Sequence, residues 1–94
     1  STSETRVLVI DDEPSILTAI SRVLSGMNVT LARGGREGLK LLLDHRNFDV
    51  ILCDVTMPDV SGIEVYETTL EVAPELAERT VFMSGGSISP STQD

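Results

Sequence analysis

Cysteine, positive charge and long apolar runs are all scarce in this sequence. The single cysteine, Cys53, excludes a disulfide within the chain and suits a reducing compartment, so we expect a cytoplasmic location. Lysine and arginine number 7 against 15 acidic residues, and the formal net charge of -8 argues against nucleic acid or an anionic membrane as a direct partner. The longest apolar runs have four residues, far too few to span a membrane, and no signal peptide is visible.

The composition is otherwise that of a small globular domain. With 94 residues, of which 40% are hydrophobic, the chain has enough apolar surface for one core and no room for a second. We therefore expect a single domain over residues 1–94, in which the polar residues 1–5 are a linker or an expression remnant. The acidic excess would suit a bound cation.

Residues 48–62 are the most informative stretch. Residues 50–53 form an apolar run rich in β-branched side chains, which is typical of a buried strand, and the run ends abruptly at Asp54. Pro58 cannot continue a strand, and the residues after it supply turn and helix-start chemistry: Asp59, Ser61 and Gly62. A carboxylate at the end of a central strand lies where open α/β sheets bind ligands, although Asp54 alone could equally cap a turn.

Strand and helix patterns alternate along the rest of the chain. Strands are expected over 6–10, 28–32, 48–54 and 80–83, and helices from Pro14 to a stop at Gly26, from Gly34 to about 45 and from Ser61 to about Val72. The expected inward stripes are Ile16, Leu17, Ile20, Val23 and Leu24, then Leu39, Leu42 and Leu43, then Ile63, Tyr66 and Leu70. After Ser84 we expect a loop or the start of a helix. The alternation predicts an α/β fold with a parallel sheet covered by helices on both faces.

Acidic side chains follow two of these strands. Asp11 and Asp12 end the first strand, Asp54 ends the third, and Ser84 ends the fourth. Because the carboxyl ends of parallel strands share one edge, the three carboxylates would converge if the first and third strands are neighbours, and their repulsion would require a cation. Mg²⁺ is the hard, oxygen-ligated ion that fits best. Taken alone, the Asp11–Asp12 pair could simply favour the start of a helix.

These motifs together resemble the receiver domain of two-component response regulators. The resemblance rests on residues 7–14, 53–62 and 82–86, and it covers the chain from about Arg6 onward. It implies a flavodoxin-like, doubly wound parallel sheet with strand order 2-1-3-4, the fifth strand of the family being absent from the chain.

The resemblance also implies the roles of the site residues. Asp54 would accept a phosphoryl group from a phosphohistidine on a histidine kinase or histidine phosphotransfer protein. Asp12 would bind Mg²⁺ directly, Asp11 through water, and Thr56 through its backbone carbonyl. Ser84 would bind a phosphoryl oxygen, and Thr56 and Gly86 would tune the lifetime of the phosphoryl group. Such a domain catalyses at most its own phosphorylation and dephosphorylation, and membership of a hybrid sensor histidine kinase is left open.

The chain departs from the family at its C-terminal side. Receivers carry a fifth strand and helix with a lysine at the strand's end, whereas the only lysine here is Lys40, in the second expected helix. Phosphorylation without that lysine should be weak. We expect the native protein to continue past Asp94; otherwise residues 80–83 would form an open edge strand, which would allow a homodimer.

Two other functions stay open at this stage. The missing lysine supports a docking module that keeps the fold but is not phosphorylated. A metal-dependent phosphohydrolase of the aspartyl-phosphate kind would need an aspartate two residues after Asp54, where Thr56 stands. Among the remaining residues, we interpret His45 as a surface residue, Cys53 as a buried hydrophobe, and the run Glu64, Glu67 and Glu71 as a solvated helix face. Gly34 and Gly35 lack the spacing of a phosphate-binding loop.

Overall fold

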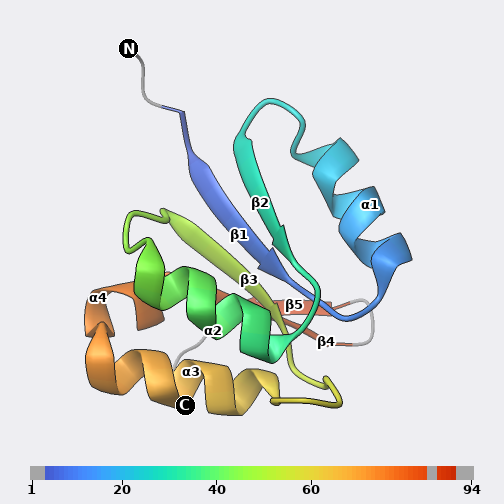
Figure 1. Cartoon of the computed structure of the whole chain (residues 1–94). Helices are drawn as coiled ribbons and strands as arrows, with labels where there is room; N and C mark the ends of the chain where they lie inside the picture. The colour runs from blue at the N-terminus through green and yellow to red at the C-terminus, as the bar shows by residue number, and fades with distance from the viewer. Residues whose placement is uncertain (1–3, 85–86, 91–94) are drawn as a thin grey trace.

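The protein folds around one mixed β-sheet. The computed structural model describes residues 4–84 and 87–90. Its sheet has five strands in the order β2-β1-β3-β4-β5 (Figure 1). The strands are β1 (Arg6–Ile10), β2 (Asn28–Ala32), β3 (Val50–Asp54), β4 (Thr80–Ser84) and β5 (Ser87–Pro90). The helices are α1 (Pro14–Val23), α2 (Gly35–Asp44), α3 (Gly62–Val72) and α4 (Pro74–Ala77).

Four of the strands run parallel in the predicted order. β1 pairs with β2 on one side and with β3 on the other, and β3 pairs with β4, all in parallel register. The predicted doubly wound arrangement with strand order 2-1-3-4 is therefore confirmed. The apolar, β-branched runs agree with the burial of these strands: four of the five β1 residues are buried, and buried residues alternate with half-buried ones along β3.

The segment after β4 corrects one of our predictions. We expected a loop or the start of a helix after Ser84, but β5 pairs with β4 in an antiparallel register, Ser84 lying opposite Ser87. Residues 85 and 86 lie outside the described residues. The expected open edge along residues 80–83 is therefore wrong, since β5 occupies it, and the homodimer through that edge loses its basis.

The sheet divides the apolar side chains between two layers. Along β1, Leu8 and Ile10 belong to one buried cluster, with Leu42 of α2 and Val65 of α3. The alternate β1 residues belong to a second cluster that includes Leu17 of α1. This alternation follows from the two-residue period of a strand. Consequently α2, α3 and α4 cover one face of the sheet and α1 covers the other, as Figure 1 shows.

Local sequence signals place the helix starts correctly. Pro14 is the first residue of α1, where its missing N–H costs nothing. Ser61 caps α3 through a capping box: the Ser61 hydroxyl accepts from the Glu64 N–H at 3.2 Å, and the Glu64 carboxylate accepts from the Ser61 N–H at 3.1 Å.

Among the described residues, no helix combines the length and hydropathy needed to cross a bilayer.

The predicted inward stripes of the helices were only partly right. In α3 the buried side consists of Gly62, Val65 and Thr69, not the expected Ile63 and Leu70. Apolar residues occur on several sides of this helix, so spacing alone does not select the face that packs. In α1 and α2, Leu17 and Leu42 are buried as predicted, whereas three expected core residues are exposed: Ile16, Val23 (81% exposed) and Leu43.

Candidate metal and phosphoacceptor site

Strand register brings the three predicted acids together. Ile10 of β1 lies opposite Cys53 of β3, so the residues that follow them, Asp11 and Asp54, leave the sheet side by side. One carboxylate oxygen from each of Asp11, Asp12 and Asp54 lies within 4.8 Å of the other two. The cluster occupies the carboxyl edge of the parallel strands, where sheets of this kind bind ligands.

Backbone groups hold the buried member of this cluster. Asp11 is only 4% exposed, its N–H donates to the Ala32 carbonyl at 3.0 Å, and its Oδ1 accepts from the Glu13 N–H at 2.9 Å. Burial raises the pKa of the Asp11 carboxyl; the Glu13 N–H opposes this rise, and the charges of Asp12 and Glu13 add to it. The side chain is thus fixed in orientation and electrostatically unfavourable without a counter-charge.

Asp54 lies in a similar environment at the end of β3. Burial raises the pKa of its carboxyl, the nearby Asp11 charge raises it further, and the Thr56 N–H, at 3.4 Å from Oδ1, lowers it. The strand continues its pairing for one more residue, since the Val55 N–H donates to the Met83 carbonyl at 3.1 Å. Asp54 is half-buried, in contrast to the buried Asp11.

The chemistry of this cluster fits a hard divalent cation. All three side chains offer carboxylate oxygens, the ligand type that Mg²⁺ prefers, and a shared cation would relieve their mutual repulsion. Asp12 is exposed, which leaves that side of the cluster accessible. A cation held there would retain open positions for water or for an oxygen of a substrate.

The other two predicted site residues lie at the same edge of the sheet. Met83 of β4 lies opposite Asp54, and Ser84 is the next residue, with an exposed side chain. Thr56 follows Asp54 by two residues and is exposed. Gly86, expected to influence the lifetime of a phosphoryl group, lies outside the described residues. The structure thus gathers three acids closely, with Thr56 two residues after Asp54 and Ser84 next to the β4 residue that pairs with Asp54; the roles of Ser84 and Thr56 stay predictions.

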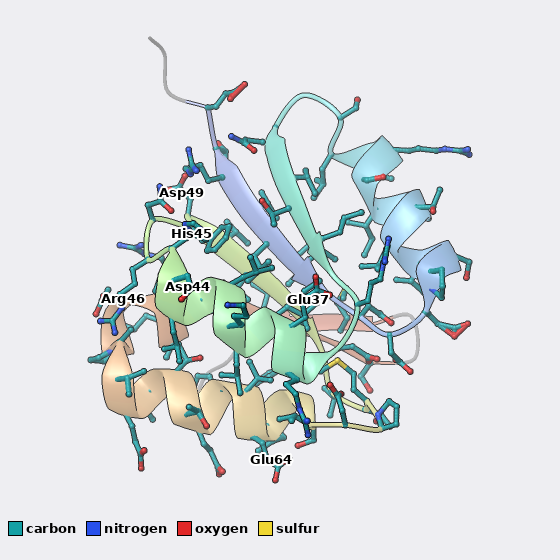
Figure 2. The ribbon with its side chains drawn as sticks, viewed as in Figure 1. Glu37, Asp44, His45, Arg46, Asp49 and Glu64 are labelled. Carbon is teal, nitrogen blue, oxygen red and sulfur yellow. The ribbon has the colours of Figure 1, made fainter. Side chains whose placement is uncertain are left out.

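The residues judged unlikely to carry chemistry lie apart from this cluster or are buried. Figure 2 shows His45 beside the end of α2, near Asp44, Arg46 and Asp49, at the amino end of β3; His45 is exposed, as predicted. Cys53 is fully buried, and burial raises the pKa of its thiol to about 12. Lys40 forms an ion pair with Asp44 at 3.3 Å on the surface of α2.

One contact near the site had no signal in the sequence. We interpreted Asp59 as turn and helix-start chemistry for α3, but its carboxylate accepts from the N–H groups of Gly35 and Arg36, at the start of α2. The partners are 24 and 23 residues away along the chain. No local pattern could reveal such a pairing, because it depends on the packing of two loops.

Comparison with known proteins identifies the family. The family model described as "Response regulator receiver domain" matches residues 7–89. The chain belongs to this family. It is thus a receiver domain of two-component signalling, with the flavodoxin-like fold that the resemblance implied.

Individual relatives and one solved structure are similar over most of the chain. The two-component response regulator ARR11 of Arabidopsis thaliana is 35% identical over 82 residues, 84% of this chain and 15% of that protein. The CAI-1 autoinducer sensor kinase/phosphatase CqsS of Vibrio cholerae is 35% identical over 94 residues, 98% of this chain and 14% of that protein. The chain therefore spans a small part of both relatives. The CheX-CheY-BeF3-Mg+2 complex of Borrelia burgdorferi is similar in structure, with a TM-score of 0.78 at 25% identity over 84% of this chain and 60% of that one.

Proposed function

We propose that this receiver domain accepts a phosphoryl group on Asp54, with Mg²⁺ held by Asp11, Asp12, Asp54 and the backbone carbonyl of Thr56. The observation that carries the proposal is the approach of three carboxylates to within 4.8 Å of one another at the ends of two neighbouring strands. Membership of the receiver family supports it, and so does the similar complex from Borrelia burgdorferi, which contains BeF3 and Mg+2.

Asp54 is the nucleophile in this proposal. One of its carboxylate oxygens attacks the phosphorus of a phosphohistidine, so that an oxygen–phosphorus bond forms while the nitrogen–phosphorus bond breaks. The electron pair of the broken bond returns to the imidazole nitrogen, which takes up a proton. Because the nitrogen–phosphorus bond is already activated, Asp54 needs little help from a general base. Mg²⁺, when bound, supplies positive charge near the transferring oxygens.

The neighbouring residues bind and orient. Asp11, fixed by the Glu13 N–H, and the exposed Asp12 would hold the cation beside Asp54. Ser84, at the exposed end of β4, would donate its hydroxyl hydrogen to a phosphoryl oxygen and so register the arrival of the group. A hydrogen bond to a charged oxygen contributes about 1.5–3 kcal/mol, enough to change the preferred position of this strand end.

The phosphoryl donor would be a histidine kinase or a histidine phosphotransfer protein in the cytoplasm. The similarity to a sensor kinase/phosphatase over 98% of the chain supports a donor of this class. The buried, unpaired Cys53 is compatible with a reducing compartment.

Labelling with a small donor tests the proposal. The protein is incubated with an acyl phosphate and Mg²⁺, and the modified residue is located by peptide mass spectrometry. We expect one phosphoryl group on Asp54, no labelling after Mg²⁺ is chelated, and no labelling of the Asp54→Asn variant. Labelling that survives the substitution would place the acceptor elsewhere and contradict the proposal.

A second candidate function is a docking module that is not phosphorylated. It is favoured by the ion pair that Lys40 forms with Asp44 on the surface of α2, since this side chain is then engaged with Asp44 and not with the acidic cluster. A docking module need not bind Mg²⁺, whereas the receiver reaction requires it. A titration with Mg²⁺ in which no binding occurs would therefore favour this second function.

A further inference from the structure

Asp59 joins the loop after β3 to the start of α2. Its Oδ1 accepts from the Gly35 N–H at 3.2 Å and its Oδ2 accepts from the Arg36 N–H at 3.0 Å. The residue at the N-cap position of α2 is Gly34, which has no side chain to cap the helix. Asp59 therefore satisfies two free N–H groups of a helix that begins 24 residues before it. The N–H of Arg36, followed by other backbone donors, lowers the pKa of the Asp59 carboxyl.

The start of α2 leaves room for this contact. A Cβ atom on Gly34 would lie 3.0 Å from Asp59 Oδ2. A Cβ atom on Gly35 would overlap the Val60 carbonyl oxygen and lie 2.8 Å from the Val60 Cβ. The two glycines, which the sequence presented only as a helix opening, thus allow the backbone of the loop to touch the end of the helix.

The same loop begins directly after Asp54, a member of the acidic cluster. The two ends of the loop are joined by a hydrogen bond from the Gly62 N–H to the Val55 carbonyl at 2.8 Å. Within the loop, Met57 is buried in the core at 6% exposure. Thr56, whose carbonyl is proposed to bind Mg²⁺, lies between these two anchors. Asp59 supplies a third anchor through its bonds to the start of α2. Figure 1 shows the loop between β3 and α3 and the start of α2 at the same end of the sheet.

We infer that Asp59 is a positioning residue for the Asp54 site: its bonds to α2 hold the loop of residues 55–61 so that the Thr56 carbonyl stays beside the three carboxylates. This inference rests on the proposed function. Mg²⁺ demands near-ideal octahedral geometry, so a loop that supplies one ligand must be held in place. Residues that orient metal ligands from outside the coordination sphere typically change metal affinity by about 10- to 100-fold.

A charge-matched pair of variants tests the inference. Glu37 also stabilises the start of α2, since its Oε1 accepts from the Arg33 N–H at 2.8 Å, and this bond lies within the α2 end and does not involve the loop of residues 55–61. Figure 2 shows Glu37 at that end of α2. Asp59→Ala and Glu37→Ala each remove one carboxylate cap and one negative charge from the same helix end. A role confined to helix stability predicts that the two variants behave alike.

The readouts are the Mg²⁺ dissociation constant from calorimetric titration and the rate of Asp54 labelling, at a temperature where thermal unfolding shows every variant to be folded. We expect Asp59→Ala to weaken Mg²⁺ binding by about tenfold and to slow labelling, in line with the effect of other orienting residues. For Glu37→Ala we expect a Mg²⁺ dissociation constant and a labelling rate within about twofold of the wild-type values, because solvent screens the loss of an exposed charge. Asp59→Asn, which keeps one acceptor oxygen, should lie between them and carries the test if Asp59→Ala does not fold.

Each outcome decides the matter. Equal effects of Asp59→Ala and Glu37→Ala on Mg²⁺ binding would overturn the inference, because charge or helix stability would then explain both. A wild-type protein that binds Mg²⁺ with the same affinity as Asp59→Ala would overturn the inference alone and leave the proposed function intact. A wild-type protein that binds no Mg²⁺ would overturn both.

Discussion

The Asp54 carbonyl oxygen lies directly against the Cα of Gly62. A Cβ atom on Gly62 would overlap that oxygen and would lie 2.9 Å from the Cα of Val55. Gly62 is also the first residue of α3, and its N–H donates to the Val55 carbonyl at 2.8 Å. The end of β3 and the start of α3 are thus in backbone contact at the proposed phosphoacceptor, and only glycine permits that distance.

Gly62→Ala should therefore affect both stability and chemistry. The added methyl group must push the Asp54 backbone away or displace α3, and we expect a loss of about 1–3 kcal/mol in the free energy of unfolding, as for other overpacked sites. Labelling of Asp54 should also slow, because its carboxylate moves relative to Asp11. Denaturant unfolding and the labelling rate measure the two effects.

Gly26→Ala is the matched control for that substitution. A Cβ atom on Gly26 would meet no atom within 4 Å, so the same chemical change should leave labelling unaltered and alter stability by less than about 1 kcal/mol. If Gly62→Ala is as well tolerated as Gly26→Ala, the close contact at Asp54 is contradicted.

Asp54→Asn should stabilise the protein when no divalent ion is present. The pKa of Asp54 is raised from its ordinary value of 3.8 by burial and by Asp11, so the folded state binds the proton more tightly than the unfolded chain. Stability then falls as the pH rises from 3.8 through the raised pKa and stays reduced at neutral pH. Because Asp54 is partly exposed, the gain on substitution should be no more than about 1 kcal/mol.

Thermal unfolding in a chelator at neutral pH checks this prediction. The variant should melt above the wild type, and the difference should shrink as the pH is lowered toward 3.8, where Asp54 becomes protonated. Added Mg²⁺ should then stabilise the wild type, by about 1.4 kcal/mol at a free concentration ten times the dissociation constant, and the variant much less. A variant that melts below the wild type in chelator would show that the acids do not repel one another.

Cys53 should be chemically inert in the folded protein. It is fully buried and burial raises the pKa of its thiol to about 12, so almost no reactive thiolate exists at neutral pH. A thiol-specific reagent should modify it slowly in native buffer and completely in denaturant, which mass spectrometry would follow over time. Rapid modification of the native protein would contradict the burial of β3.

Much of the fold could be predicted from short local signals. The spans of β1 and β2, the start of α1 at Pro14 and the Ser61 cap of α3 all agree with the sequence patterns, because strand runs and helix caps depend on neighbouring residues. The buried side of α3 and the pairing of β5 with β4 could not be predicted this way. Both depend on which surfaces meet in three dimensions, and for α3 the apolar residues left more than one choice.

The candidate site was likewise predictable only where local sequence patterns determine it. The approach of Asp11 to Asp54 follows from strand ends that carry acids in a parallel sheet, and the register of Ile10 with Cys53 brings it about. The bond from Asp59 to Gly35 has no counterpart in any local pattern, since its partners are 24 residues apart. Sequence motifs thus indicate the reacting groups, whereas the contacts that hold them in place emerge only from the packed structure.

The central claim is that three carboxylates share one Mg²⁺ ion. The most direct test is to titrate Mg²⁺ into the wild type and into the Asp12→Asn variant by calorimetry and to compare the two affinities. Asp12 is exposed, so its substitution should leave the fold intact while removing a ligand. We predict that the wild type binds one Mg²⁺ and that Asp12→Asn binds it at least about tenfold more weakly, a loss of roughly 1.4 kcal/mol. Equal affinities in the two proteins, or no binding by the wild type, would contradict the account.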